Sequence, residues 1–256
     1  MAKKTTRKST KTAASGRARQ ATRAPKGGDV APMGLLRRVR RRIVRLGLAV
    51  VVLWVVWILA YAVIPVPVTP YMMAERMREG ELDYQWTPID DMAPVLARSV
   101  VAAEDANFCL HWGFDMAAIR DAIEHGGARG ASTISQQTVK NAFLWHGRSW
   151  PRKAIEALTT PVVEMLWSKR RILEVYLNIA EFDAGVFGVE AASRHYFGVG
   201  PDEVSAIQAA RLAAVLPSPK DRSAGKPGQF VQRRARQIAD GAATIAADGR
   251  AGCFED

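Results

Sequence analysis

Gly130-Ala-Ser-Thr-Ile-Ser-Gln-Gln-Thr-Val-Lys-Asn-Ala-Phe143 is the stretch of sequence from which the fold class follows. Thr133 and Gln136 fit a capping box, in which each side chain accepts a hydrogen bond from the other residue's backbone N–H at the start of a helix. The pattern predicts a helix that ends near Phe143 and follows a glycine-rich loop. Because no run beyond residue 95 alternates apolar and polar residues as a strand does, we expect a mainly α-helical body.

Further helices are expected on both sides of this stretch. Ala117–Glu124 is predicted to form one helix before the glycines. After them, Pro151 suits the first turn of a helix over Arg152–Trp167. Helices are also predicted over Lys169–Asn178 and over residues 229–247.

The predicted helix over 152–167 has two distinct faces. One face is apolar and is expected to be a core stripe. Its members are Ile155, Leu158, Val162, Met165 and Leu166. The other face carries Glu156 beside Thr160, Val163 and Trp167, and we expect this face to line a cleft.

A second informative stretch is Leu46-Gly-Leu-Ala-Val-Val-Val-Leu-Trp-Val-Val-Trp-Ile-Leu-Ala-Tyr-Ala-Val-Ile64, nineteen residues without a charge. A bilayer core of about 30 Å needs roughly 20 helical residues, so a transmembrane helix is predicted over 46–65. Six arginines precede it: Arg37, Arg38, Arg40, Arg41, Arg42 and Arg45. The positive-inside rule then places the N-terminus in the cytoplasm and the remaining body outside it.

A cleaved signal peptide is the alternative, because Ala60-Tyr-Ala62 matches a cleavage pattern. The apolar run is longer than the usual signal region of about 7–15 residues, and its preceding basic segment is also long. We therefore favour a retained anchor.

The net charge of +11 is unevenly distributed. Residues 1–45 hold 15 Lys and Arg against one acid, whereas residues 46–256 hold 21 bases and 24 acids. The first segment has too little apolar surface to fold, and we interpret it as a disordered cytoplasmic tail rather than a nucleic-acid-binding module. The other predicted boundaries are a connector over 66–95, a catalytic core over 96–220, and a C-terminal helix and tail over 221–256.

Two cysteines exclude a disulfide-dense scaffold and a cysteine-rich zinc site. Cys109 is expected to pack as a small apolar residue. A Cys109–Cys253 bond is the less favoured alternative.

Polar residues in the body suggest carbohydrate chemistry on a phosphate-bearing substrate. Glu104 and Glu156 are a carboxylate pair of the kind used for acid–base work at a sugar carbon. The cations between or beside them suit a phosphate. They are Lys140, Arg148, Arg152 and Lys153. Neutral side chains suited to a sugar are Ser132, Thr133, Gln136 and Gln137.

These segments resemble the biosynthetic peptidoglycan glycosyltransferases, the family-51 transglycosylases, and in particular their monofunctional members. The chain matches the motifs E-D-x-x-F-x-x-H-x-G from Glu104 and G-x-S-T-x-x-Q-Q-x-x-K-N from Gly130. It also matches R-K-x-x-E from Arg152 and K-x-x-I-L-E-x-Y-L-N from Lys169. The resemblance covers roughly residues 90–220 and implies a lysozyme-like, two-lobed helical domain behind one membrane helix.

The family mechanism, carried to matching positions, makes Glu104 the general base that deprotonates the acceptor's 4-hydroxyl. The sugar is transferred with inversion, lipid II is polymerised into glycan strands, and polyprenyl diphosphate departs. Lys140 and Arg148 would stabilise that diphosphate, and Asn141 would join the binding site. Glu156 would position the cations or a metal, or protonate the leaving group.

The resemblance also implies the setting of the enzyme. Its partners would be lipid II, the growing glycan and the membrane, with other cell-wall synthesis or division proteins as candidates and no nucleic acid. It would lie in the bacterial inner membrane with its catalytic domain in the periplasm. No metal site is expected, although Mg²⁺ or Mn²⁺ stays open as a cofactor. Apolar residues around the glycine-rich loop and in Phe143-Leu-Trp145 are expected to reach the membrane surface, with ordinary core packing as the alternative.

Two smaller expectations concern the first motif and the competing enzyme class. His111 is expected to orient its loop, with Asp105 and Asp115 as loop or helix-cap acceptors rather than catalysts. A glycan-cleaving enzyme shares the two-carboxylate logic, but it would leave the cations unexplained.

Overall fold

The computed structural model describes Met1 and residues 33–124, 132–147 and 149–255. The chain divides into two units, residues 1–51 and 52–256. Helix α1 (Met33–Tyr61) begins in the first unit, and its segment Arg37–Tyr61 is long and apolar enough to cross a membrane. The predicted basic tail, the glycine-rich loop and Arg148 lie largely or wholly outside the described residues.

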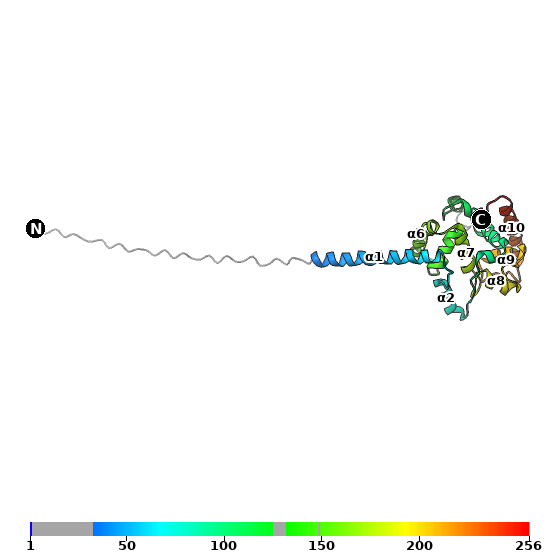
Figure 1. Ribbon diagram of the computed structural model, residues 1–256, viewed down its shortest axis with the longest axis horizontal. Coiled ribbons are helices and arrows are strands. Elements are labelled where there is room, and N and C mark those ends of the chain that lie inside the picture. Colours follow the sequence, from blue (N-terminus) through cyan, green and yellow to red (C-terminus); the bar gives the residue numbers. More distant parts are fainter. Residues whose placement is uncertain (2–32, 125–131, 148, 256) are drawn as a thin grey trace. The chain divides into compact units, whose positions relative to one another are not determined.

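The second unit is mainly α-helical, as predicted (Figure 1). Its helices are α2 (Pro70–Glu79), α3 (Pro94–Glu104), α4 (Met116–Glu124), α5 (Ile134–Phe143), α6 (Trp150–Leu166), α7 (Lys169–Ile179), α8 (Gly188–Phe197), α9 (Ala206–Val215), α10 (Gln229–Ala247) and α11 (Gly252–Glu255), with 3-10 turns η1 (Ile89–Asp91) and η2 (Phe108–Leu110). The predictions for α4, α5, α6, α7 and α10 are confirmed within two residues at each end.

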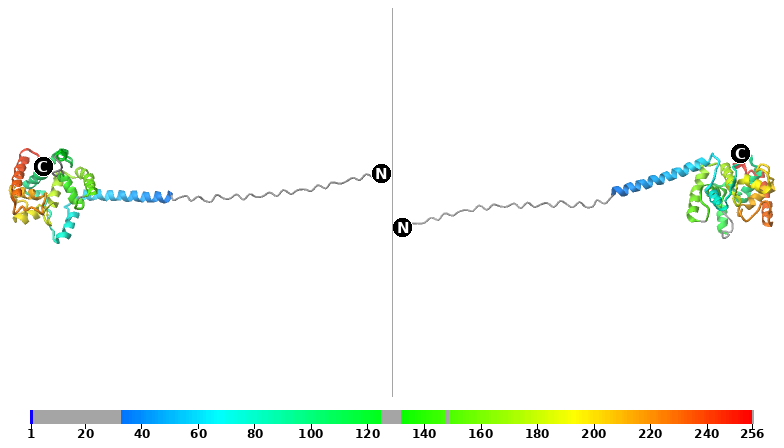
Figure 2. Two further views of the ribbon diagram at one scale, coloured as in Figure 1. Left: turned by 180° about the vertical axis from the view of Figure 1, so that it is seen from behind. Right: turned by 90° about the horizontal axis from the view of Figure 1, so that it is seen from below.

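The helices form two groups around α7. In one group α10 packs on α3 and α9, which also contact each other, and in the other α5 packs on α6 and α7. Figure 2 shows the α8–α10 side and the α5–α6 side as separate parts of this unit. The buried side of α7 supplies the central core with Ile172, Leu173, Val175, Tyr176, Leu177 and Ile179.

A small sheet joins a strand that precedes α3 to two short strands that follow α7. Its strands β1 (Asp83–Tyr84), β3 (Val186–Phe187) and β2 (Glu181–Asp183) lie in that order, with β1 parallel and β2 antiparallel to β3. The segment 66–95, predicted to be a connector, contains α2, β1, η1 and the start of α3.

The prediction that the apolar stripe of α6 is a core stripe is wrong. Leu158 and Met165 are 76% and 69% exposed, whereas Glu156 and Thr160 on the other face are 2% and 0% exposed. Apolar periodicity identifies a face but not what covers it. The polar face of α6 points into the protein, and the apolar face is open.

The last turns of α1 belong to the second unit. Trp54, Trp57 and Tyr61 surround Phe143, with ring centroids 5.3–5.8 Å from it. Trp167 Nε1 donates to the Ile58 carbonyl at 2.9 Å. Phe143 and Leu144 are buried, so the expectation that they reach the membrane surface is wrong, although Trp145 is exposed.

The C-terminus is fastened to the domain. Cys109 and Cys253 form a disulfide, which corrects the expectation that Cys109 packs as a free apolar residue. Phe254 is fully buried, and Glu255 accepts two hydrogen bonds from Arg98, at 2.6 and 2.8 Å. Residues 229–255 are thus part of the packed fold rather than a loose tail.

Candidate active site

Glu104 is the last residue of α3 and its side chain is partly buried. Gln137 Nε2 on α5 donates to Glu104 Oε2 at 2.9 Å, and Tyr176 on α7 donates to Gln137 Oε1 at 3.2 Å. Burial raises the pKa of the Glu104 carboxyl, opposed by the Gln137 hydrogen bond and by the charges of Arg234 and Lys140. The side chain is therefore a held carboxyl of increased basicity, as a general base requires.

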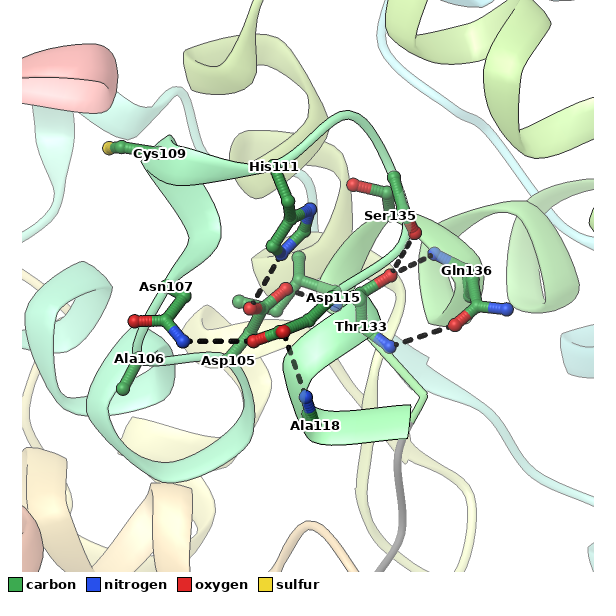
Figure 3. A network of polar contacts seen from close by, with 12 residues as sticks. Asp105, Ala106, Asn107, Cys109, His111, Asp115, Ala118, Thr133, Ser135 and Gln136 are labelled. Carbon is green, nitrogen blue, oxygen red and sulfur yellow. Dashed lines mark hydrogen bonds and ion pairs between the residues drawn. The ribbon is translucent and has the colours of Figure 1, made fainter. Parts of the chain in front are cut away.

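The residue after Glu104 fastens its loop to α5. Asp105 is buried, and its Oδ1 lies 2.8 Å from His111 Nε2 (Figure 3). Its Oδ2 accepts a hydrogen bond from the Ile134 backbone N–H at 2.9 Å. His111 Nδ1 has no hydrogen-bond partner in the described part of the chain. The predicted structural roles of Asp105 and His111 are supported by these contacts.

Asp115 and Thr133 order the two helices that border the glycine-rich loop. Asp115 Oδ1 accepts from the Ala117 and Ala118 N–H groups, and this hydrogen bonding lowers the pKa of the Asp115 carboxyl. Thr133 and Gln136 form the predicted capping box, and Thr133 also donates to the Gly113 carbonyl at 2.7 Å. Both side chains therefore have structural partners already.

Glu156 holds two of the predicted cations. Arg152 Nη1 lies 2.8 Å from Glu156 Oε2, and the Lys153 ammonium pairs with Oε1. Arg152 also donates from Nε to the Gly147 carbonyl at 2.7 Å. Because Glu156 is buried and paired twice, it fixes these cations in place rather than standing as an isolated acid.

Lys140 differs from its neighbours because its side-chain ammonium has no hydrogen bond or ion pair to any described residue. It is partly buried on α5, and both Glu104 and Glu156 are close enough to raise the pKa of its ammonium, although burial lowers that pKa more strongly. A desolvated ammonium without a fixed partner is suited to an anionic ligand.

The remaining predicted residues lie around this centre. Ser132 is exposed, and Lys153 Nζ lies 3.5 Å from its hydroxyl. Asn141 is buried beside Lys140. A cavity of about 350 Å³ borders Glu104 and is also lined by Ser132, Thr133 and Asp115.

Sequence reasoning missed one buried group of contacts behind the site. Glu164 on α6 accepts from the Ser135 hydroxyl and pairs with Lys169 Nζ at 2.8 Å. Lys169 also donates to the His111 carbonyl at 2.7 Å and lies over the Phe108 ring, 4.4 Å from its centroid. The motif position of Lys169 was the available signal, but spacing did not reveal its partners.

Sequence reasoning also missed Arg234, which comes from α10. Its Nη2 donates to the Ala103 carbonyl at 3.1 Å, one residue before Glu104.

A metal site does not emerge from these residues. Within the described ranges, no three His, Cys, Asp or Glu side chains come together in a way that could hold a metal ion.

A sequence model of the family described as transglycosylase matches residues 72–243. The biosynthetic peptidoglycan transglycosylase of Jannaschia sp. (strain CCS1) is 64% identical over 220 residues, 86% of this chain and 92% of the relative. The proteins of the same name from Caulobacter vibrioides (strain ATCC 19089 / CIP 103742 / CB 15) and Stutzerimonas stutzeri (strain A1501) are 44% and 47% identical, over 85% and 80% of this chain and 96% and 88% of theirs. The chain therefore belongs to the biosynthetic peptidoglycan transglycosylases, the monofunctional peptidoglycan glycosyltransferases with a lysozyme-like domain.

Proposed function

We propose that the protein polymerises lipid II into glycan strands by an inverting displacement that releases polyprenyl diphosphate. Glu104 deprotonates the acceptor's 4-hydroxyl, whose oxygen then attacks the anomeric carbon of the lipid-linked sugar. The observation that carries this proposal is that two groups of opposite charge lie near each other. One is the Glu104 carboxyl, held by a hydrogen bond from Gln137, and the other is the partly buried Lys140 ammonium, which has no ion-pair partner among the described residues. One can take the proton while the other stabilises charge on the leaving diphosphate.

Glu156 acts by holding cations in this scheme. Its two ion pairs fix Arg152 and Lys153, and so favour positioning over proton donation among its three candidate roles. Fixed cations stabilise developing phosphate charge without reorganisation at the moment of reaction. Arg148, outside the described residues, is proposed to join them through its family position.

The substrate lies in a membrane, and two features suit that location. The exposed apolar side of α6, with Leu158 and Met165, is proposed to rest against the bilayer surface. Tethering through α1 raises the local concentration of substrate at the site.

The disulfide supports a periplasmic catalytic domain. Disulfides persist outside the cytoplasm and are rare within it, so the Cys109–Cys253 bond agrees with the orientation predicted from the arginines before α1. We propose an inner-membrane enzyme with a cytoplasmic N-terminus. Other cell-wall synthesis or division proteins are candidate partners.

The test is polymerisation of purified lipid II by the full chain in detergent, with products separated by gel electrophoresis. We expect glycan polymer from the native protein, none from Glu104→Gln, and native levels from Glu81→Gln, whose carboxyl is exposed and carries no catalytic role. Lipid II should still bind to Glu104→Gln. Turnover by that variant would remove Glu104 as the base, and shortening of preformed glycan without polymer would indicate a glycan-cleaving enzyme instead.

A further inference from the structure

Arg234 connects α10 to the end of the helix that bears Glu104. Its Nη2 donates to the Ala103 carbonyl at 3.1 Å. That carbonyl belongs to the last turn of α3, where backbone acceptors lack a partner within the helix. The end of a helix also carries partial negative charge, which disfavours a carboxylate there. A guanidinium at this place donates a hydrogen bond to the carbonyl, and its positive charge offsets both the partial charge of the helix end and the charge of the Glu104 carboxylate.

The charged groups around Glu104 make Arg234 distinctive. Asp105 follows it on the chain and disfavours its ionised form, whereas Lys140 on α5 and Arg234 on α10 favour it. The neutral partners are Gln137, which donates to the carboxyl, and the buried Tyr176 hydroxyl behind it. On the cavity side, the further carboxylates are Asp115 and Asp121. The charges of Lys140 and Arg234 therefore oppose that of Asp105 and the effect of burial.

These two cations become unequal once substrate binds, if the proposed function holds. The bound diphosphate neutralises much of the positive charge of Lys140, so Lys140 then stabilises the Glu104 carboxylate less. Arg234 lies on α10, in the other group of helices from Lys140, and its side chain donates to a carbonyl rather than to an acid, so its charge stays with Glu104.

We propose that Arg234 is a positioning residue that fixes the end of α3 and keeps Glu104 ionised while the substrate diphosphate occupies Lys140. The proposal rests on the role of Glu104 as general base. Arg234 touches no reacting atom, so its effect must be visible in the pH dependence of turnover.

The experiment measures kcat and KM for lipid II polymerisation by the full chain in detergent across the acid limb of its pH profile. Arg234→Met removes the charge, Arg234→Gln keeps a donor without it, and Arg234→Lys keeps the charge. The matched control is Arg233→Met, because Arg233 is the exposed neighbour on the same helix.

We expect both uncharged variants to shift the acid limb of the pH profile of kcat to higher pH by about one unit. At pH values well below the midpoint of that limb, kcat should therefore fall about tenfold. Above the limb their rates should return to the native plateau, with KM unchanged. Arg234→Lys should restore most of the native profile, and Arg233→Met should overlay it.

The proposal would be overturned if both uncharged variants kept the native acid limb in the pH profile of kcat. It would also be overturned if they lost the same fraction of the rate at every pH, because that result indicates a structural role alone. Should Arg234→Met fail to fold by circular dichroism, Arg234→Gln decides the matter. Glu104→Gln separates the two hypotheses. If it is inactive while the Arg234 limb is native, only Arg234 loses its role, and if it turns over, the proposed base is wrong.

Discussion

Loss of the Cys109–Cys253 bond should destabilise the catalytic domain strongly. The two cysteines are 144 residues apart in sequence, so the bond closes most of the domain into one loop. In the chain-entropy treatment, a loop of this length restricts the unfolded chain by about 5 kcal/mol at 25 °C. We expect the free energy of unfolding of Cys109→Ser/Cys253→Ser to fall by about 3–5 kcal/mol, because residual structure in the unfolded chain reduces the ideal value.

Guanidinium unfolding of the full chain in detergent, followed by tryptophan fluorescence, measures this loss in oxidised and reduced protein. The readout is clean because the whole chain contains only these two cysteines. A thiol titration of protein isolated without reductant should find none free. Two free thiols there, or coincident unfolding curves for the oxidised and reduced forms, would refute the reasoning.

Three further predictions concern the site. Glu164→Ala leaves the partly buried Lys169 ammonium without its carboxylate but with its hydrogen bond to the His111 carbonyl, and should lower the free energy of unfolding by about 3 kcal/mol in chemical denaturation, unlike the exposed Leu158→Ala. Gly113→Ala should cost at least about 1–3 kcal/mol and reduce polymerisation, because Gly113 has φ +82° and a Cβ there would lie 2.6 Å from the Thr160 methyl carbon; a native melting temperature would contradict this. Burial lowers the pKa of Lys140, so its charge, and with it kcat, should be lost with rising pH sooner than for an ordinary lysine, and an active Lys140→Arg variant should keep activity to higher pH in an alkaline rate profile.

Local sequence rules predicted α4, α5, α6, α7 and α10 well but gave no helix at α2, α3 or α8. The capping box at Thr133 and the helical pattern over 229–247 depend on neighbours within a few residues, and both are found. The apolar stripe of α6 was misjudged because a repeating apolar face looks the same whether protein or lipid covers it. The small sheet was missed because its strands have only two or three residues.

The candidate site could be predicted from the sequence for residues that stand in recognisable motifs. It could not be predicted for contacts between residues far apart in the sequence. Glu104, Lys140 and Glu156 stand in recognisable patterns, and the structure brings the Lys140 ammonium within range of both carboxylates. Arg234 reaches a backbone carbonyl about 130 residues away, a contact that leaves no pattern in the sequence. The disulfide was equally hidden, because the separation of two cysteines in sequence says nothing of their distance in space.

Neighbouring arginines on α7 hold both ends of the described domain. Arg171 Nε donates to the Tyr61 carbonyl at 3.0 Å, and Arg170 Nη1 donates to the Phe254 carbonyl at 2.9 Å. Terminal segments are usually where fraying and proteolytic attack begin. Here each end is attached to a largely buried helix of the core, so a protease gains little by cutting at these ends. Degradation of the enzyme then depends on opening of the core as a whole, which makes its lifetime a matter of unfolding rate.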